Sequence, residues 1–172
     1  LHNLELPYQA VTSTDLYLTH YLNDSANDPV MNRIRAQKLR NSEEDKVKIF
    51  FVPSYLNGDD GVFNMPYYDL LVGMDLTAFP SYYEPWGYTP LESLAFKVPT
   101  ITTTLAGFGL WVKEHYNMNH PGIEVIHRED GDASNVATAI AEWVKNYTQV
   151  GETEMQKDRD NAKDVSLSLI HI

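Results

Sequence analysis

The sequence predicts an α/β fold of the doubly wound class, a Rossmann-like parallel sheet with helices on both faces. Short β-branched runs alternate with helical segments at intervals of about 20–25 residues. With 172 residues and 43% hydrophobic content, the chain is long and apolar enough to bury one core. No internal repeat or low-complexity tract interrupts the alternation.

Two local sequence patterns predict the main elements in the first half of the chain. The tripeptide Asn-Asp-Pro at 27–29 combines an Asx cap with proline at the first helical position, and predicts a basic amphipathic helix that runs to about Arg40. Residues 47–52 read Val-Lys-Ile-Phe-Phe-Val, which predicts a buried strand. A short helix is expected at 67–73, and strand or loop at 1–22.

In the second half, each expected strand is followed by at least one expected helix. The strands are 76–79, 100–103 and 123–126, and the helices are 90–96, 107–115, 132–149 and 152–165. The helix at 132–149 carries its apolar residues on one side, which indicates a buried face. Because doubly wound folds bind ligands at the carboxyl ends of their strands, the loops after Phe79 and Thr103 are the expected place of a site.

Composition excludes several classes of protein. The net charge of −11 argues against nonspecific binding to nucleic acid or to anionic membranes. The chain has no cysteine, so it has no disulfide or thiolate metal site, as in a reducing cytoplasm. No apolar run approaches the roughly 20 residues needed to span a bilayer. His115, His120 and His127 match no zinc pattern, so no metal is expected.

The stretch at 79–92 carries the chemistry. Its two carboxylates, Glu84 and Glu92, stand eight residues apart across an aromatic loop and the start of a helix. Burying a carboxylate among aromatic rings is costly unless it is paired, so Glu84 is predicted to be functional. The surrounding rings are expected mainly to pack; they are Tyr82, Tyr83, Trp86 and Tyr88.

The start of that helix, Thr89-Pro90-Leu91-Glu92, has two interpretations. In the first it is a capping box, in which Glu92 bonds back to the N–H of Thr89. In the second the free N–H groups and the helix dipole hold a diphosphate, and Glu92 points outward to accept hydrogen bonds from hydroxyls. Residue spacing alone leaves both open.

The segment Tyr83-Glu84-Pro-Trp-Gly-Tyr-Thr-Pro-Leu-Glu92 resembles the E-x7-E segment of the eukaryotic-type glycogen synthases, glycosyltransferase family 3. The resemblance covers roughly residues 19–130. Further segments match in the same order: Thr19-His20, 26–29, 32–35, Asn41-Ser42, 45–48, 55–57, Tyr68-Asp69, 79–81 and 107–109.

The resemblance implies the C-terminal Rossmann-like half of a GT-B enzyme that transfers glucose from UDP-glucose to the non-reducing end of glycogen or another α-1,4-glucan, with retention. It implies a cytoplasmic enzyme without a cofactor, which forms a homo-oligomer at full length. The chain starts at Leu1, so we expect a fragment: a partial nucleotide-sugar-binding domain over 1–165 and a truncated or aberrant tail over 166–172. Without the N-terminal domain and the basic phosphate ligands upstream, the fragment is expected to be inactive.

The resemblance also implies roles for individual residues. Glu84 would contact hydroxyls of the donor glucose and stabilise the positive charge near the anomeric carbon, and Glu92 would hold the ribose hydroxyls. Tyr68 resembles the tyrosine that stacks on uracil, but its spacing to Glu84 is one residue short. The remaining residues are Gly87, Tyr88 and Thr89 at the diphosphate, and Gly107, Phe108 and Gly109 at the border of the donor site. The glycine segment is alternatively a tight strand-to-helix turn.

Three other functions stay open at this point. One is a different retaining GT-B glucosyltransferase, with ADP-glucose as donor or a small sugar as acceptor. Another is a non-catalytic glycan- or nucleotide-binding module, against which the retained Glu84 and Glu92 argue. Paired carboxylates also suggest a glycosidase, which the resemblance disfavours.

Overall fold

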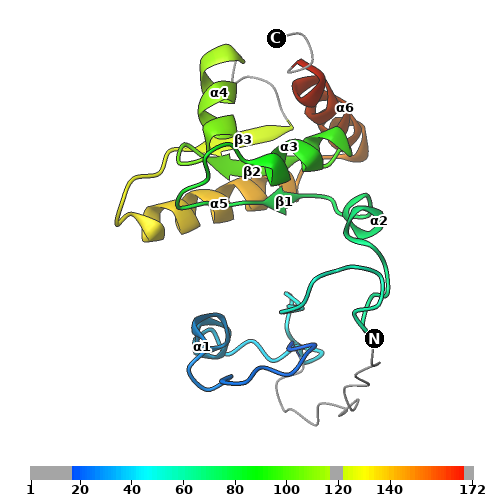
Figure 1. Cartoon of the computed structure of the whole chain (residues 1–172), viewed down its shortest axis with the longest axis vertical. Coiled ribbons are helices and arrows are strands. Elements are labelled where there is room, and N and C mark those ends of the chain that lie inside the picture. Colours follow the sequence, from blue (N-terminus) through cyan, green and yellow to red (C-terminus); the bar gives the residue numbers. More distant parts are fainter. Residues whose placement is uncertain (1–16, 117–121, 169–172) are drawn as a thin grey trace, which may run out of the picture. The chain divides into compact units, whose positions relative to one another are not determined.

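The structure is a computed structural model that describes residues 17–116 and 122–168. The chain divides into two compact units, Leu1–Tyr67 and Tyr68–Ile172, called unit 1 and unit 2 below (Figure 1). Each unit is described by itself. The expectation of one partial domain over 1–165 stays a prediction.

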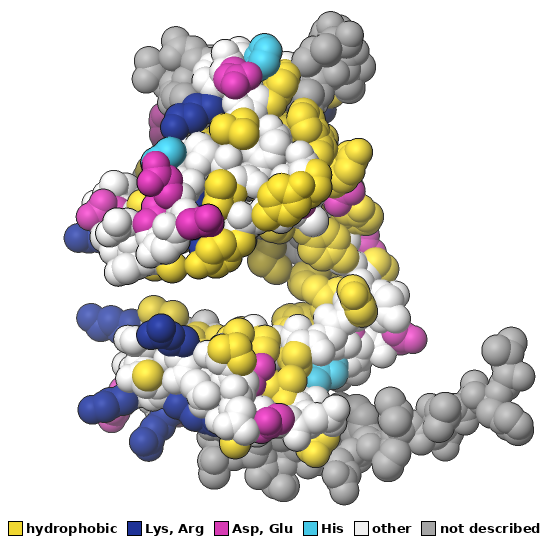
Figure 2. Space-filling view, turned by 60° about the vertical axis from the view of Figure 1, so that its left-hand side comes forward, with side chains coloured by type: hydrophobic (Ala, Val, Ile, Leu, Met, Phe, Trp, Pro, Cys, Tyr) yellow, Lys and Arg dark blue, Asp and Glu magenta, His cyan; other side chains and the backbone are white. Residues whose placement is uncertain are grey.

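The described part of unit 1 contains helix α1 (Pro29–Ala36). The Asp28 carboxylate accepts hydrogen bonds from the N–H groups of the two residues after the proline, both at 2.9 Å, which confirms the expected helix start. The helix ends before the expected Arg40, because Lys38 takes a left-handed conformation with φ 58° that breaks the helical path. Lysine and arginine side chains gather on one side of this unit (Figure 2).

The prediction of a strand at 47–52 is wrong. Among the described residues, this run forms only a parallel bridge, between Leu18 and Phe51. The backbone of Ile49 pairs instead with the Asn41 side chain, which donates to its carbonyl at 2.6 Å and accepts from its N–H at 2.9 Å. At Ile49 a side chain thus takes the place of a neighbouring strand.

The described residues of unit 2 form a parallel sheet of three strands in the order β1-β2-β3. They are β1 (Thr77–Ala78), β2 (Thr100–Thr103) and β3 (Ile123–Ile126). Thr100 lies opposite Thr77 on one side and Ile123 on the other. Because all strands run the same way, their carboxyl ends lie at one edge of the sheet.

Helices lie on both faces of this sheet (Figure 1). Besides α2 (Tyr67–Leu71) they are α3 (Tyr88–Ala95), α4 (Gly107–His115), α5 (Ala133–Tyr147) and α6 (Glu152–Ser168). Helices α3, α4 and α6 contribute to one core cluster, made of Leu94, Phe108, Val112, Ile123, Val125, Ala162 and Val165. Helix α5 packs in a second cluster with Ile101 and Ile126.

The alternation of β3 explains the two clusters. Ile123 and Val125 point to the first cluster, and Ile126 points to the second. The structure therefore confirms the predicted α/β class, a Rossmann-like parallel sheet with helices around it. Within residues 17–116 and 122–168, no helix has the length and apolarity that crossing a membrane requires.

Helix α6 continues to Ser168, past its expected end at residue 165. The first three residues of the tail expected to be aberrant therefore form helix, and Ser166 is buried. Residues 169–172 lie outside the described part of the chain.

Candidate functional site

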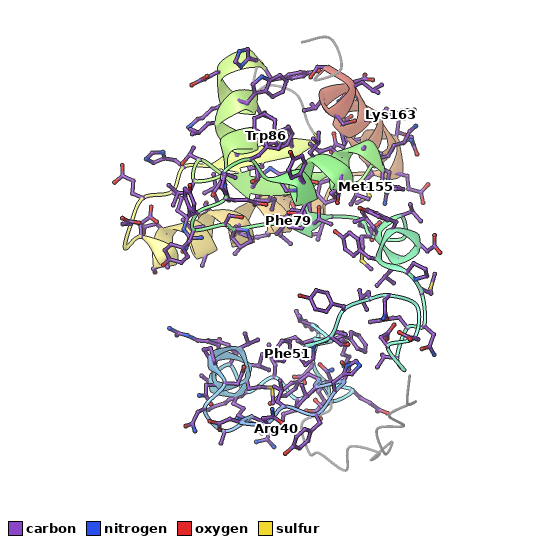
Figure 3. The ribbon with its side chains drawn as sticks, in the orientation of Figure 1. Arg40, Phe51, Phe79, Trp86, Met155 and Lys163 are labelled. Atoms are coloured by element: carbon purple, nitrogen blue, oxygen red, sulfur yellow. The ribbon has the colours of Figure 1, made fainter. Side chains whose placement is uncertain are left out.

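The loop that joins β1 to α3 lies across the carboxyl end of β2. The N–H of Glu84 donates to the Leu105 carbonyl and the N–H of Gly107 donates to the Glu84 carbonyl, each at 3.1 Å. One step further along, Phe108 donates to the carbonyl of Trp86, which is labelled in Figure 3. The first N–H groups of α4 are thus used to hold the loop that carries Glu84.

The two glycines of α4 allow this close approach. A Cβ on Gly107 would lie 2.2 Å from the Pro85 carbonyl oxygen, and a Cβ on Gly109 would lie 2.2 Å from that of Thr103. Both contacts are too short for any side chain, so the glycines have a steric reason to be there. The side chain of Phe108 is fully buried and packs between Trp86 and Trp111, so both its backbone N–H and its ring contact the loop at Trp86.

The Glu84 carboxylate is half-buried and hydrogen-bonded. The Ser81 hydroxyl donates to its Oε2 at 2.9 Å. The neighbouring rings do not enclose it as expected: Tyr82, Tyr83 and Tyr88 are 58%, 81% and 66% exposed. The expectation that these rings mainly pack is wrong for Tyr83 and Tyr88, whereas Tyr82 packs one face of its ring against the Arg128 guanidinium. It is confirmed for Trp86, which packs against the first core cluster.

Of the two interpretations of this helix start, the capping box is wrong. Helix α3 begins at Tyr88 with Gly87 as its N-cap, at φ 105° and ψ 68°, and no side chain caps it. Thr89 is therefore the second residue of the helix and is exposed, so its side chain does not cap. The cap position takes a left-handed conformation that glycine adopts at low cost. The start of α3 keeps N–H groups that no side chain covers, as the second interpretation of this segment requires.

Glu92 has a different partner from the expected one. It shares a hydrogen bond with the Tyr68 side chain, and this bond is the main cause that raises the pKa of Tyr68, followed by the charge of Glu92. The Tyr68 ring also stacks on Phe96, with centroids 5.1 Å apart and planes 16° apart. Two predicted site residues from α2 and α3 are thus brought together.

Sequence reasoning missed two residues that hold the Glu84 loop, one at the end of β2 and one just after β3. The Thr103 hydroxyl donates to the Ser81 carbonyl at 3.0 Å. Arg128 donates from Nη1 to the Pro80 carbonyl at 2.5 Å, and its guanidinium lies 3.7 Å from the centroid of the Tyr82 ring. One available signal was position, because Arg128 closely follows a strand at the carboxyl edge of the sheet.

The histidines give no sign of a metal centre among the described residues. His115 and His127 are exposed, and His120 lies outside the described part of the chain. No group of three or more histidine or acidic side chains that could hold a metal ion occurs within residues 17–116 and 122–168.

The family model described as glycogen synthase matches residues 9–170. The liver glycogen (starch) synthase of Mus musculus is 42% identical over 149 residues, which is 86% of this chain and 21% of that protein. Glycogen (starch) synthase isoform 1 of Saccharomyces cerevisiae is 34% identical over 154 residues, 88% of this chain and 22% of that protein. The glycogen (starch) synthase of Caenorhabditis elegans is 37% identical over 133 residues, which is 77% of this chain and 20% of that protein.

The matches cover most of this chain but only about a fifth of the length of these curated relatives. The matched residues 9–170 include Glu84, Glu92 and the loops that hold them. The chain therefore belongs to the glycogen synthase family.

Proposed function

We propose that the protein containing this chain transfers glucose from UDP-glucose to the non-reducing end of an α-1,4-glucan such as glycogen, with retention at the anomeric carbon. Unit 2 would supply part of the donor site. The observation that carries the proposal is the placement of Glu84. Its carboxylate is fixed by Ser81 at the carboxyl edge of a parallel sheet, where folds of this class bind ligands.

Glu84 would act by electrostatics. An oxocarbenium-like transition state gains from a preorganised negative charge near the anomeric carbon. The Ser81 hydroxyl limits rotation of the carboxylate, and the two backbone bonds to Leu105 and Gly107 limit movement of the loop. A charge held in this way needs little reorganisation during reaction.

The leaving diphosphate would bind at the start of α3. Gly87 leaves the first N–H groups uncapped by a side chain, and Tyr88 and Thr89 are exposed there. Uncapped N–H groups and the helix dipole favour an anion without a metal ion. By contrast, the N–H groups of Gly107 and Phe108 are already bonded to the Glu84 loop. We therefore assign the diphosphate to α3, and a bordering role to residues 107–109.

Glu92 would hold the ribose, with the base near Tyr68. One face of the Tyr68 ring stacks on Phe96, so only the other face remains for uracil. Since the spacing from Tyr68 to Glu84 is one residue short of the family pattern, the preceding Tyr67 is the competing candidate. Calorimetry of UDP binding to Tyr67→Ala and Tyr68→Ala distinguishes them, because loss of the stacking residue weakens binding by roughly 10-fold or more.

The remaining features of the proposal follow from the family. The enzyme would be cytoplasmic, would need no cofactor besides its donor substrate, and would work as a homo-oligomer at full length. Its expected lack of binding to nucleic acid and membranes rests instead on the net charge of −11 in this chain. Calorimetry with UDP and ADP on the full-length protein tests the nucleotide, because an ADP-glucose enzyme would favour ADP. The isolated 172-residue chain should show no radiolabelled glucose transfer, since it spans only about a fifth of its relatives.

The deciding experiment is Glu84→Gln in the full-length protein. We expect the kcat for glucose transfer to fall by about 100-fold or more, because the amide keeps the shape and loses the charge. The control is Glu142→Gln, an exposed glutamate on α5, which should leave the rate unchanged. Transfer by Glu84→Gln near the wild-type rate would show that the role given to Glu84 is wrong.

A further inference from the structure

Arg128 is unusually well fixed for an arginine. It follows β3 with one residue between, and only 6% of its surface is exposed. Its backbone N–H donates to the Thr104 hydroxyl at 2.9 Å, and that hydroxyl lies 3.3 Å from its carbonyl. The backbone from which the side chain starts is thus tied to the end of β2.

Both side-chain partners of Arg128 belong to the loop that carries Glu84. Nη1 bonds to the Pro80 carbonyl, and the guanidinium lies over the Tyr82 ring. Among the described residues no carboxylate forms an ion pair with Arg128, and its Nε has no hydrogen-bond partner. A buried cation without a counter-ion is costly, so the carbonyl and the ring are what stabilise it there.

Ser81 stands between these two contacts. Its carbonyl accepts a hydrogen bond from Thr103, and its hydroxyl donates to Glu84. Arg128 therefore contacts Pro80 and Tyr82, the residues on either side of Ser81. We propose that Arg128 is a positioning residue, which acts on the reaction through Ser81 by holding the Glu84 carboxylate in place. The catalytic consequence rests on the proposed function, whereas the restraint on the loop does not.

Hydrogen exchange measures the restraint directly. In the 172-residue chain, Arg128→Met should speed exchange of the Glu84 and Gly107 N–H groups by about 10-fold, because a charge-assisted bond and a cation–π contact are lost. The matched control is Arg159→Met. Arg159 also bonds backbone carbonyls, those of Met74 and Lys97, but near the amino ends of β1 and β2.

Exchange in the Glu84 loop should stay at the wild-type rate in Arg159→Met, and Arg128→Lys should restore part of the protection. If Arg128→Met fails to fold, Tyr82→Ala serves instead, because Tyr82 is 58% exposed and its removal spares the core. That variant should speed exchange about 3-fold. Unchanged loop exchange in the folded variant would overturn the proposal, whatever the enzyme does.

Kinetics of the full-length protein test the consequence. Arg128→Met should lower kcat by about 10–100-fold and change the KM for UDP-glucose by less than about 2-fold, because it disturbs a group that acts in the transition state. Arg159→Met should leave both values unchanged. A wild-type kcat in an Arg128→Met enzyme with a loosened loop would refute the positioning role. Absence of glucose transfer by the wild-type enzyme would instead refute the proposed function and leave the exchange result standing.

Discussion

At the scale of single residues, the site depends on glycines that a larger residue could not replace without strain. Gly107 lies against the Pro85 carbonyl, where an added Cβ would be only 2.2 Å from the oxygen, whereas at Gly87 an added Cβ would make an ordinary contact of 3.5 Å with Glu84 Oε2 and the backbone conformation sets the limit. Gly87 also has a φ of 105°, which side chains with a Cβ rarely adopt. These glycines set how near the loop approaches the sheet, and therefore where the Glu84 carboxylate stands.

Replacing Gly107 by alanine should displace the Glu84 loop. The new Cβ would meet the Pro85 oxygen at 2.2 Å, so either the loop or the start of α4 must move. We expect a loss of about 1–3 kcal/mol in the free energy of unfolding of the 172-residue chain, measured by urea denaturation. The control is Gly151→Ala, where an added Cβ meets nothing within 4 Å. Equal stability of the two variants would contradict the close approach.

At the scale of elements, the start of α3 decides what Glu92 can do. Without a capping box, the Glu92 carboxylate is not tied to the helix backbone and bonds to Tyr68 on α2 instead. The two helices thus hold two polar groups together beside N–H groups that no side chain caps. A ligand with hydroxyls and a phosphate can use both.

The elements that the sequence predicts well are those with strong local signals. The expected strands at 100–103 and 123–126 and the expected helix at 107–115 have the same bounds in the structure. The run at 47–52 failed because β-branched residues favour extended backbone but do not supply a partner strand. The capping box failed because a glycine before Thr89 had already provided the cap.

The site was predictable in part for the same reason. Glu84 and Glu92 lie in one contiguous motif, so a pattern along the chain finds both. Other contacts join residues that are far apart in sequence, so only the fold brings them together. They are the hydrogen bond between Tyr68 and Glu92 and the one from Arg128 to the Pro80 carbonyl. Ser81 and Thr103 are common residue types with no motif to mark them.

Removing the Tyr68 hydroxyl should alter stability in a pH-dependent way. Because the bond to Glu92 raises the pKa of Tyr68 above its ordinary value of 10.0, the bond stabilises the fold fully below that pH. This stability is lost as the pH rises through the raised pKa. Tyr68→Phe should therefore have a lower Tm than wild type at pH 8, and the gap should narrow above pH 10.

Thermal unfolding of the 172-residue chain at both pH values checks this. The control is Tyr55→Phe, because Tyr55 is 92% exposed and its variant should match wild type at pH 8. A gap of the same size at pH 8 and well above pH 10 would mean that the hydroxyl does not act through this bond.

At the scale of the whole of unit 2, the packing of helices on both faces of the sheet buries a polar side chain, that of Asp158 on α6. Helix α6 presses its backbone against Gly122, where a Cβ would lie 2.6 Å from the Asp158 carbonyl oxygen. The Asp158 side chain is consequently only 4% exposed, and its Oδ1 has no hydrogen-bond partner among the described residues. Burial raises the pKa of Asp158, and the charge of Glu154 raises it further.

Asp158→Asn should therefore stabilise the chain at neutral pH. A carboxyl whose pKa is raised in the folded state stabilises the protein most when protonated, and this stability falls as the pH rises through the raised pKa. The amide carries no charge to desolvate, so we expect the free energy of unfolding at pH 7 to rise by roughly 1 kcal/mol. The Tm of the variant at pH 7 should therefore exceed that of wild type. Near pH 4 the two proteins should have the same Tm.

The matched control is Asp164→Asn, which removes the same charge from an exposed position on α6 and so reports the general charge repulsion in a chain of net charge −11. If Asp158→Asn proves less stable than wild type at pH 7, the buried carboxylate must have a stabilising partner.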